Sequence, residues 1–173
     1  GFQHMGIVPD LVCCGKGISG GMPLSAVLGT EDLMNLYGPG EMTSTHSANP
    51  VCAAAALANL QVIEEQKLVE NAASLAPLLA EGCRRIQQAS RGKITQWDAA
   101  GLVGALQFTH PGSVDSNPDA AWKFVWEAVK RGIMLFAPVG VGGGAVKINP
   151  PLVISQEALQ EGLGVLEEVV RTV

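Results

Sequence analysis

Two long helical segments follow one another near the middle of the chain, and they constrain the fold more than any other feature. Asn49 followed by Pro50 is typical of a helix start, because asparagine caps free N–H groups and proline suits the first helical position. This alanine-rich segment extends to about Gln66. A second helical period, extending to about Ala89, follows and places these apolar residues on one face: Leu68, Ala72, Leu75, Leu79 and Ile86. We expect the helix pair to link two structural units, residues 1–66 and 67–173.

Short apolar runs bounded by glycine, proline or polar residues lie on both sides of these helices and predict strands. Before the helices they are Pro9 to Cys14 and Leu24 to Leu28, followed by a short helix from Glu31 to Tyr37. After the helices, strands are predicted at 94–97, 102–108, 133–136 and 145–148, and a helix at 118–131. Ser155 is predicted to cap a last helix with one apolar stripe, formed by Leu159, Leu163, Leu166 and Val170. The alternation is βαβ-like, and the predicted fold class is α/β.

The composition indicates a globular protein and excludes some partners. Of the 173 residues, 47% are hydrophobic and 16% are charged, which is sufficient for a core. The 11 Lys and Arg residues against 16 Asp and Glu give a net charge of -5, which argues against nucleic acid as a partner. No apolar stretch reaches the ~18 to 20 residues of a bilayer span, so we expect no membrane partner.

The cysteines give no sign of a metal site or a disulfide framework. Cys13, Cys14, Cys52 and Cys83 form no CxxC pair, and the three histidines are scattered. No signal peptide is visible at the amino end. We therefore expect no metal, reduced thiols and a cytoplasmic location.

Lys16 is the strongest candidate for chemistry. It follows an apolar strand and stands in a loop with Gly15, Gly17, Gly20 and Gly21, which keeps bulky side chains away. A phosphate loop would need glycine at position 10 and Ser or Thr at position 17, where this chain has Asp and Gly. A lysine that forms a Schiff base with a cofactor aldehyde suits the position better. Taken alone, Lys16 is also compatible with an ordinary surface turn.

Four segments, in order, resemble one known family. They are Pro9 to Val27 (PDLVCCGKGISGGMPLSAV), Thr45 to Pro50 (THSANP) with the alanine-rich helix after it, Gly101 to Gly104 (GLVG), and Lys147 to Ser155 (KINPPLVIS). Together they resemble the class III, pyridoxal-phosphate-dependent aminotransferases. The resemblance covers essentially the whole chain, and four ordered motifs are far more specific than one.

The resemblance implies a fold, a cofactor and roles for three residues. The fold implied is the type I fold of pyridoxal-phosphate enzymes, with residues 1–66 as the late part of the large cofactor-binding domain. Residues 67–173 would then be a linker helix and the small carboxy-terminal domain. Lys16 is implied to hold pyridoxal 5'-phosphate as a Schiff base and then to move the substrate's proton. Thr45 is implied to bind the cofactor phosphate of the partner subunit in a homodimer.

Lys147 departs from the pattern of the family. Family members commonly carry arginine there, and that arginine holds the substrate carboxylate with a two-pronged guanidinium. Lysine supplies the charge without the fork, so the implied substrate-binding role of Lys147 leaves the substrate geometry and the reaction type open. A strand-edge lysine exposed to solvent is the alternative interpretation of Lys147.

The family motifs that precede this region have no counterpart before Gly1. These are the glycine loop for the phosphate, the aromatic residue that stacks on the cofactor ring, and the acid that pairs with the pyridine nitrogen. We therefore expect this chain to be a partial enzyme, from a cut chain or a partial gene, that does not turn over substrate alone.

Transamination, with a small-molecule amino donor and a 2-oxo acid acceptor, is the leading functional hypothesis. The alternatives are another reaction of the same cofactor, such as decarboxylation, elimination or racemisation, and a non-catalytic fragment that folds and self-associates. A nucleotide-binding module is a more distant possibility.

Overall fold

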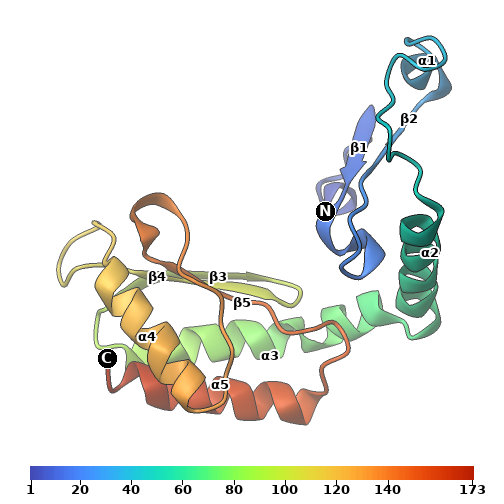
Figure 1. Ribbon diagram of the computed structural model, residues 1–173. Coiled ribbons are helices and arrows are strands. Elements are labelled where there is room, and N and C mark those ends of the chain that lie inside the picture. Colours follow the sequence, from blue (N-terminus) through green and yellow to red (C-terminus); the bar gives the residue numbers. More distant parts are fainter. The chain divides into compact units, whose positions relative to one another are not determined.

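The computed structural model describes residues 1–173, which divide into two compact units, Gly1–Lys67 and Leu68–Val173 (Figure 1). Each unit contains its own sheet, and every strand pair in both sheets is antiparallel. The protein is therefore a mixed fold of helices and strands, as its sequence predicted.

The first unit is built around a two-stranded sheet and one long helix. Strand β1 (Leu11–Cys14) pairs with β2 (Ala26–Gly29), and Cys14 lies opposite Ala26. The short 3-10 helix η2 (Lys16–Ser19) lies between these strands in the chain and packs against helix α2 (Pro50–Glu65). Two further short helices are η1 (Phe2–Met5) and α1 (Glu31–Met34).

The predicted start of α2 is confirmed in detail. The Asn49 side-chain oxygen Oδ1 accepts hydrogen bonds from the backbone N–H of Val51 at 3.0 Å and of Cys52 at 3.2 Å. Pro50, which has no N–H, occupies the first helical position. The first turn of α2 therefore has its free donors satisfied from within the chain.

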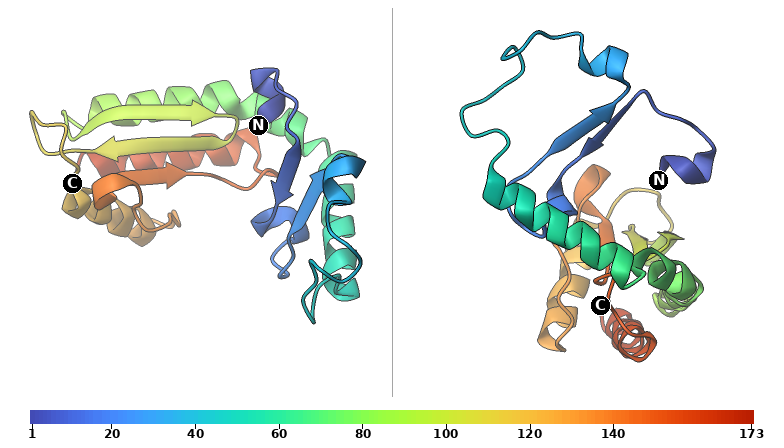
Figure 2. Two further views of the ribbon diagram at one scale, coloured as in Figure 1. Left: turned by 90° about the horizontal axis from the view of Figure 1, so that it is seen from above. Right: turned by 90° about the vertical axis from the view of Figure 1, so that its right-hand side faces the viewer.

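The second unit is a three-stranded sheet with helices on one face. In chain order its elements are α3 (Leu68–Ala89), β3 (Ile94–Ala100), β4 (Val103–Phe108), α4 (Pro118–Lys130), the 3-10 helix η3 (Val141–Gly143), β5 (Ala145–Ile148) and α5 (Gln156–Val170). The strand order is β3-β4-β5. Helices α3 and α4 pack on the strands, and α5 packs against both helices. Figure 2 shows α3 and α5 on the same side of this sheet.

The strand pairing of this unit was not predicted, and one expected strand is absent. Strands β3 and β4 form an antiparallel hairpin in which Ala100 lies opposite Val103. The connection is only Gly101 and Leu102, and Gly101 takes the positive φ of 57° that such a tight turn needs. The predicted strand at Ile133 to Phe136 does not form, because no neighbouring strand pairs with this segment.

The hydrophobic core lies entirely within the second unit. Leu79, Leu106 and Phe124 are fully buried in it, and the predicted stripe of α5 faces it. Glu167 on α5 accepts hydrogen bonds from Arg85 on α3 at 3.1 Å and from Arg171 at 2.6 Å. These partly exposed ion pairs add little to the stability that the apolar core provides.

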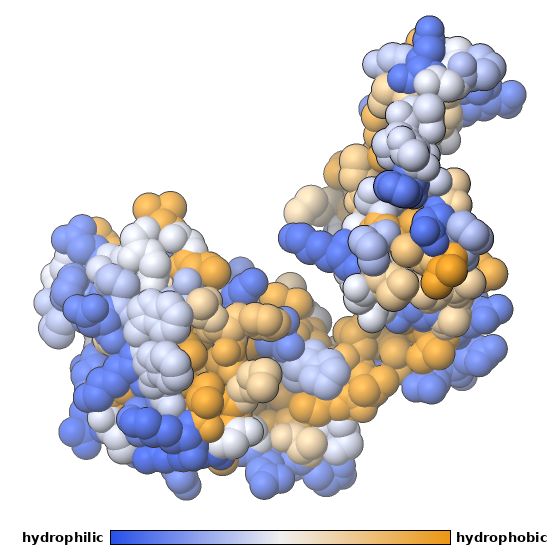
Figure 3. Space-filling view, viewed as in Figure 1, coloured by the Kyte–Doolittle hydropathy of each residue, from blue (hydrophilic) through white to orange (hydrophobic).

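The first unit buries few apolar side chains. Its buried hydrophobic residues are Cys52 and Ala56, whereas Val8, Leu28 and Leu36 are at least 60% exposed. Figure 3 shows apolar residues of this unit in orange at the surface. Among the helices of both units, none combines the length and apolar character required to cross a membrane.

Candidate functional site

Lys16 occupies an unusual backbone position at the end of β1. Its φ is 51°, in the left-handed region that residues other than glycine seldom adopt. Gly15 before it is extended, and Gly20 and Gly21 after it have φ of 63° and 113°. The Lys16 side chain is exposed and takes part in none of the chain's four ion pairs. A free primary amine therefore stands on a sharply turned backbone.

Asn59 on α2 holds this turn, and sequence reasoning missed it. Its side-chain amide nitrogen Nδ2 donates to the backbone carbonyls of Gly17 at 3.0 Å and Ile18 at 3.2 Å. Ser19, which is buried, bonds through its hydroxyl to the carbonyl of Met22. The sequence does contain one sign of this role. Asn59 is the single polar residue in the apolar stretch 51–60, which belongs to the helix that directly follows the Thr45 loop.

Thr45 is exposed in the loop that precedes α2. Neighbouring side chains shape this loop: the Thr43 and Ser47 hydroxyls are 3.1 Å apart, and the Ser47 hydroxyl donates to the Ser44 carbonyl at 2.7 Å. The backbone N–H groups of Val51 and Cys52 are already bonded to Asn49. These two donors are therefore occupied, and the Thr45 hydroxyl is the candidate ligand for an anion.

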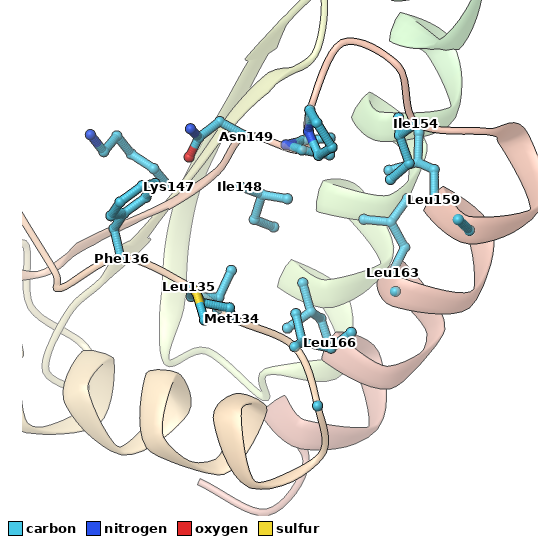
Figure 4. A pocket seen from close by; sticks show the side chains of 16 residues that line it. Met134, Leu135, Phe136, Lys147, Ile148, Asn149, Ile154, Leu159, Leu163 and Leu166 are labelled. Carbon is cyan, nitrogen blue, oxygen red and sulfur yellow. The ribbon is translucent and has the colours of Figure 1, made fainter. Parts of the chain in front are cut away.

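Lys147 lies on edge strand β5 and faces away from the core, because its neighbours Val146 and Ile148 are buried. Its ammonium nitrogen Nζ lies 5.8 Å from the centre of the Phe136 ring, within reach of a cation–π contact. Beside it is a cavity of about 260 Å³ that Ile148, Leu159 and Leu163 line with apolar groups. Figure 4 shows Lys147 next to Phe136 at one side of this cavity, and Asn149 at its rim.

The three candidate residues belong to two different units. Lys16 and Thr45 lie in the first unit, joined through α2, and Lys147 lies in the second. Within the first unit, the donor set fits a cofactor that carries an aldehyde and a phosphate. The Lys16 amine can react with the aldehyde, and a Cβ at Gly17 or Gly21 would meet no atom within 4 Å, so the backbone near Lys16 is uncrowded. The Thr45 hydroxyl can donate a hydrogen bond to the phosphate.

A sequence model of one family, described as class III aminotransferase, matches residues 1–170. Among curated proteins, the 4-aminobutyrate aminotransferase of Mycobacterium leprae is 34% identical over 167 residues, which cover 96% of this chain and 37% of that protein. The isoleucine 2-epimerase of Lentilactobacillus buchneri is 35% identical over 170 residues, covering 96% of this chain and 36% of that protein. The chain thus spans little more than a third of the length of these relatives.

Solved structures agree with these matches. A phospholyase from Arthrobacter, in complex with phosphoethanolamine, superposes with a TM-score of 0.86 at 27% identity, and the match covers 99% of this chain and 41% of that one. The similarity therefore extends over both units of the chain.

Proposed function

The chain belongs to the class III aminotransferase family, whose cofactor is pyridoxal phosphate, and from this membership we propose that it carries the lysine half of an aminotransferase site. In the proposed reaction an amino donor loses its amino group and becomes a carbonyl compound, while a 2-oxo acid gains that group. The observation that carries the proposal is the free amine of Lys16 on a glycine-flanked turn at a strand end. The match over residues 1–170 supports it.

Lys16 is proposed to act twice through its Nζ atom. It binds the cofactor covalently through the aldehyde, and once the substrate amine has taken its place the freed Nζ accepts and returns a proton. Pyridoxal phosphate, when bound, supplies an electron sink for the bond that breaks at the amino-bearing carbon. Thr45 is proposed to hold the phosphate through its hydroxyl.

Lys147 is proposed to bind the substrate carboxylate. An ammonium offers a single point of charge and up to three donors, whereas a guanidinium offers a planar fork. A site with lysine therefore fixes the direction of the carboxylate less tightly than a site with arginine. We expect it to accept carboxylates that differ in angle and distance from the reacting amine.

The active enzyme is further proposed to be a homodimer in which Thr45 serves the cofactor of the partner subunit. The exposed apolar side chains of the first unit support a contact of this kind. All four cysteines are free thiols, which supports the cytoplasm as the place of the reaction.

An assay of amino transfer tests the proposal. The enzyme that contains this chain is supplied with an amino donor and 2-oxoglutarate, and the keto product and glutamate are measured together. We expect the two products in equal amounts, loss of activity by about a thousandfold or more in Lys16→Ala, and a KM for carboxylate donors raised about tenfold in Lys147→Gln. Keto product without a matching amount of glutamate would contradict transamination.

Mixing two inactive variants tests the dimer. If Lys16 and Thr45 act on the same cofactor from different subunits, a mixture of Lys16→Ala and Thr45→Ala subunits contains dimers with one intact site. Activity should then exceed that of either variant alone. If the mixture is no more active than the separate variants, Lys16 and Thr45 of the same subunit act on the same cofactor.

Epimerisation is the second candidate function. It is favoured by the isoleucine 2-epimerase relative, which is as similar to this chain as the aminotransferase relative. Incubation of a chiral amino acid without any oxo acid separates the two. An epimerase inverts the amino acid under these conditions, whereas an aminotransferase stops after one equivalent of keto product.

A further inference from the structure

The turn that carries Lys16 is weakly held by its own backbone. Its internal hydrogen bonds are long: the Ile18 N–H donates to the Gly15 carbonyl at 3.3 Å, and the Gly20 N–H donates to the Gly17 carbonyl at 3.2 Å. Glycines surround Lys16, and these residues lose the most conformational freedom when a loop is fixed. Lys16 itself has a left-handed φ of 51° that needs support from its surroundings.

The support comes from α2. Both bonds of the Asn59 amide reach residues 41 and 42 positions earlier in the chain, so they tie the turn to a different element. That element is a 16-residue helix with a capped start. The Gly17 carbonyl accepts from both Asn59 and Gly20, which fixes the residue that directly follows Lys16.

The same helix also begins next to the Thr45 loop. Asn59 lies ten residues after the cap Asn49, about 15 Å along the axis at the rise of an α-helix. One rigid element therefore sets the Lys16 turn at one point and the Thr45 loop at its end. A shift of the turn relative to α2 would move the Lys16 amine without moving the Thr45 loop, which we assign to the cofactor of the partner subunit.

We propose that Asn59 is a positioning residue for Lys16: its amide locks the turn onto α2 and aims the Lys16 amine. The inference rests on the proposed function of Lys16. An aspartate at position 59 has the same shape but presents only acceptors to the two carbonyls, so Asn59→Asp removes both hydrogen bonds and adds repulsion.

The second unit offers a matched control. Asn71 on α3 makes the same pair of hydrogen bonds, because its Nδ2 donates to the carbonyls of Leu152 at 2.7 Å and Ile154 at 3.2 Å. Asn71→Asp therefore breaks an equivalent pair of bonds away from the Lys16 turn.

The first arm of the test uses nuclear magnetic resonance on the 173-residue chain. In Asn59→Asp, the Lys16 Cα and Cβ shifts should leave the left-handed range and its backbone should become mobile, while α2 keeps helical shifts. Asn71→Asp should leave the Lys16 signals unchanged. Unchanged Lys16 signals in Asn59→Asp would overturn the proposal, and so would the loss of α2, because Asn59 would then be a general structural residue.

The second arm uses the enzyme that contains this chain. Misplacing a proton-transfer group slows the chemical step, so kcat should fall on the order of tenfold or more in Asn59→Asp, with little change in KM. The isotope effect of a donor deuterated at the amino-bearing carbon should rise. If KM rises and kcat stays constant, the proposal is wrong. If the unsubstituted enzyme transfers no amino group, the proposed function fails, and the Lys16 signals of the first arm decide the inference.

Discussion

The two units of the chain differ in how they are stabilised. The second unit closes a core between its sheet and three helices, in which Leu79, Leu106 and Phe124 are fully buried. The first unit buries only Cys52 and Ala56 among its hydrophobic residues. It contains Lys16 and Thr45, to which we assign the cofactor chemistry. The comparison indicates that the stability of this chain lies in one unit and most of its proposed chemistry in the other.

A pair of leucine substitutions tests this contrast with the largest expected effect. Leu79→Ala, at a fully buried position, should destabilise the second unit by about 2 to 5 kcal/mol through lost burial and a residual cavity. Leu28→Ala, at a side chain that is 60% exposed, should change stability by no more than about 0.5 kcal/mol. Urea unfolding followed by circular dichroism measures both. Equal effects would show that the first unit has a core that we have not recognised.

Thiol alkylation gives the next largest difference. Burial raises the pKa of Cys83 from 9.0 to about 11, so near pH 8 this thiol has roughly a hundredfold less thiolate than one at the ordinary value. Cys13 in the first unit is exposed. Timed labelling with iodoacetamide and peptide mass analysis should therefore find Cys13 modified long before Cys83. Similar rates for the two would mean that the core of the second unit opens readily.

Two glycines in helices provide a test of side-chain packing in the second unit. A Cβ at Gly82 on α3 would lie 2.5 Å and 2.6 Å from the two methyl carbons of Leu163, whereas one at Gly164 on α5 would meet nothing within 4 Å. Gly82→Ala should cost about 1 to 3 kcal/mol by overpacking, and Gly164→Ala should gain up to about 1 kcal/mol from helix propensity. Thermal unfolding measures whether each substitution lowers or raises the stability. A stabilising Gly82→Ala would contradict close packing of α3 and α5.

The smallest effect concerns pH. The hydrogen bond from Arg84 lowers the pKa of Glu81, and the one from Lys130 lowers that of Glu127, both from an ordinary 4.5. Because the folded pKa lies below the unfolded one, the stabilisation is present above about pH 4.5 and is lost as pH falls through the folded values. Unfolding midpoints between pH 6 and pH 3 should decline less steeply in Glu81→Gln and in high salt. If neither change affects how steeply the unfolding midpoint falls with pH, these ion pairs do not contribute to the pH dependence of stability.

Local signals in the sequence predicted much of the fold. The Asn49 cap, the helical period of α3 and the stripe of α5 depend on neighbouring residues, and all are confirmed. Strand pairing was not predicted. The order β3-β4-β5 and the unpaired segment at Ile133 to Phe136 are decided by which strands meet in space. Alternation of helices and strands does not contain that information.

The candidate site, too, was predicted only in part from the sequence. Lys16, Thr45 and Lys147 were identified by motif, and their assigned roles remain predictions. Asn59 was not identified, because its role depends on a contact with residues 41 and 42 positions away.

Chemical trapping is the most direct test of whether Lys16 holds the cofactor. The purified chain is incubated with pyridoxal phosphate, reduced with borohydride and mapped by peptide mass, with Lys16→Ala as the control. We expect a pyridoxyl adduct concentrated on Lys16 and absent from that position in the control. An adduct spread evenly over Lys16, Lys67 and the other lysines would contradict this expectation.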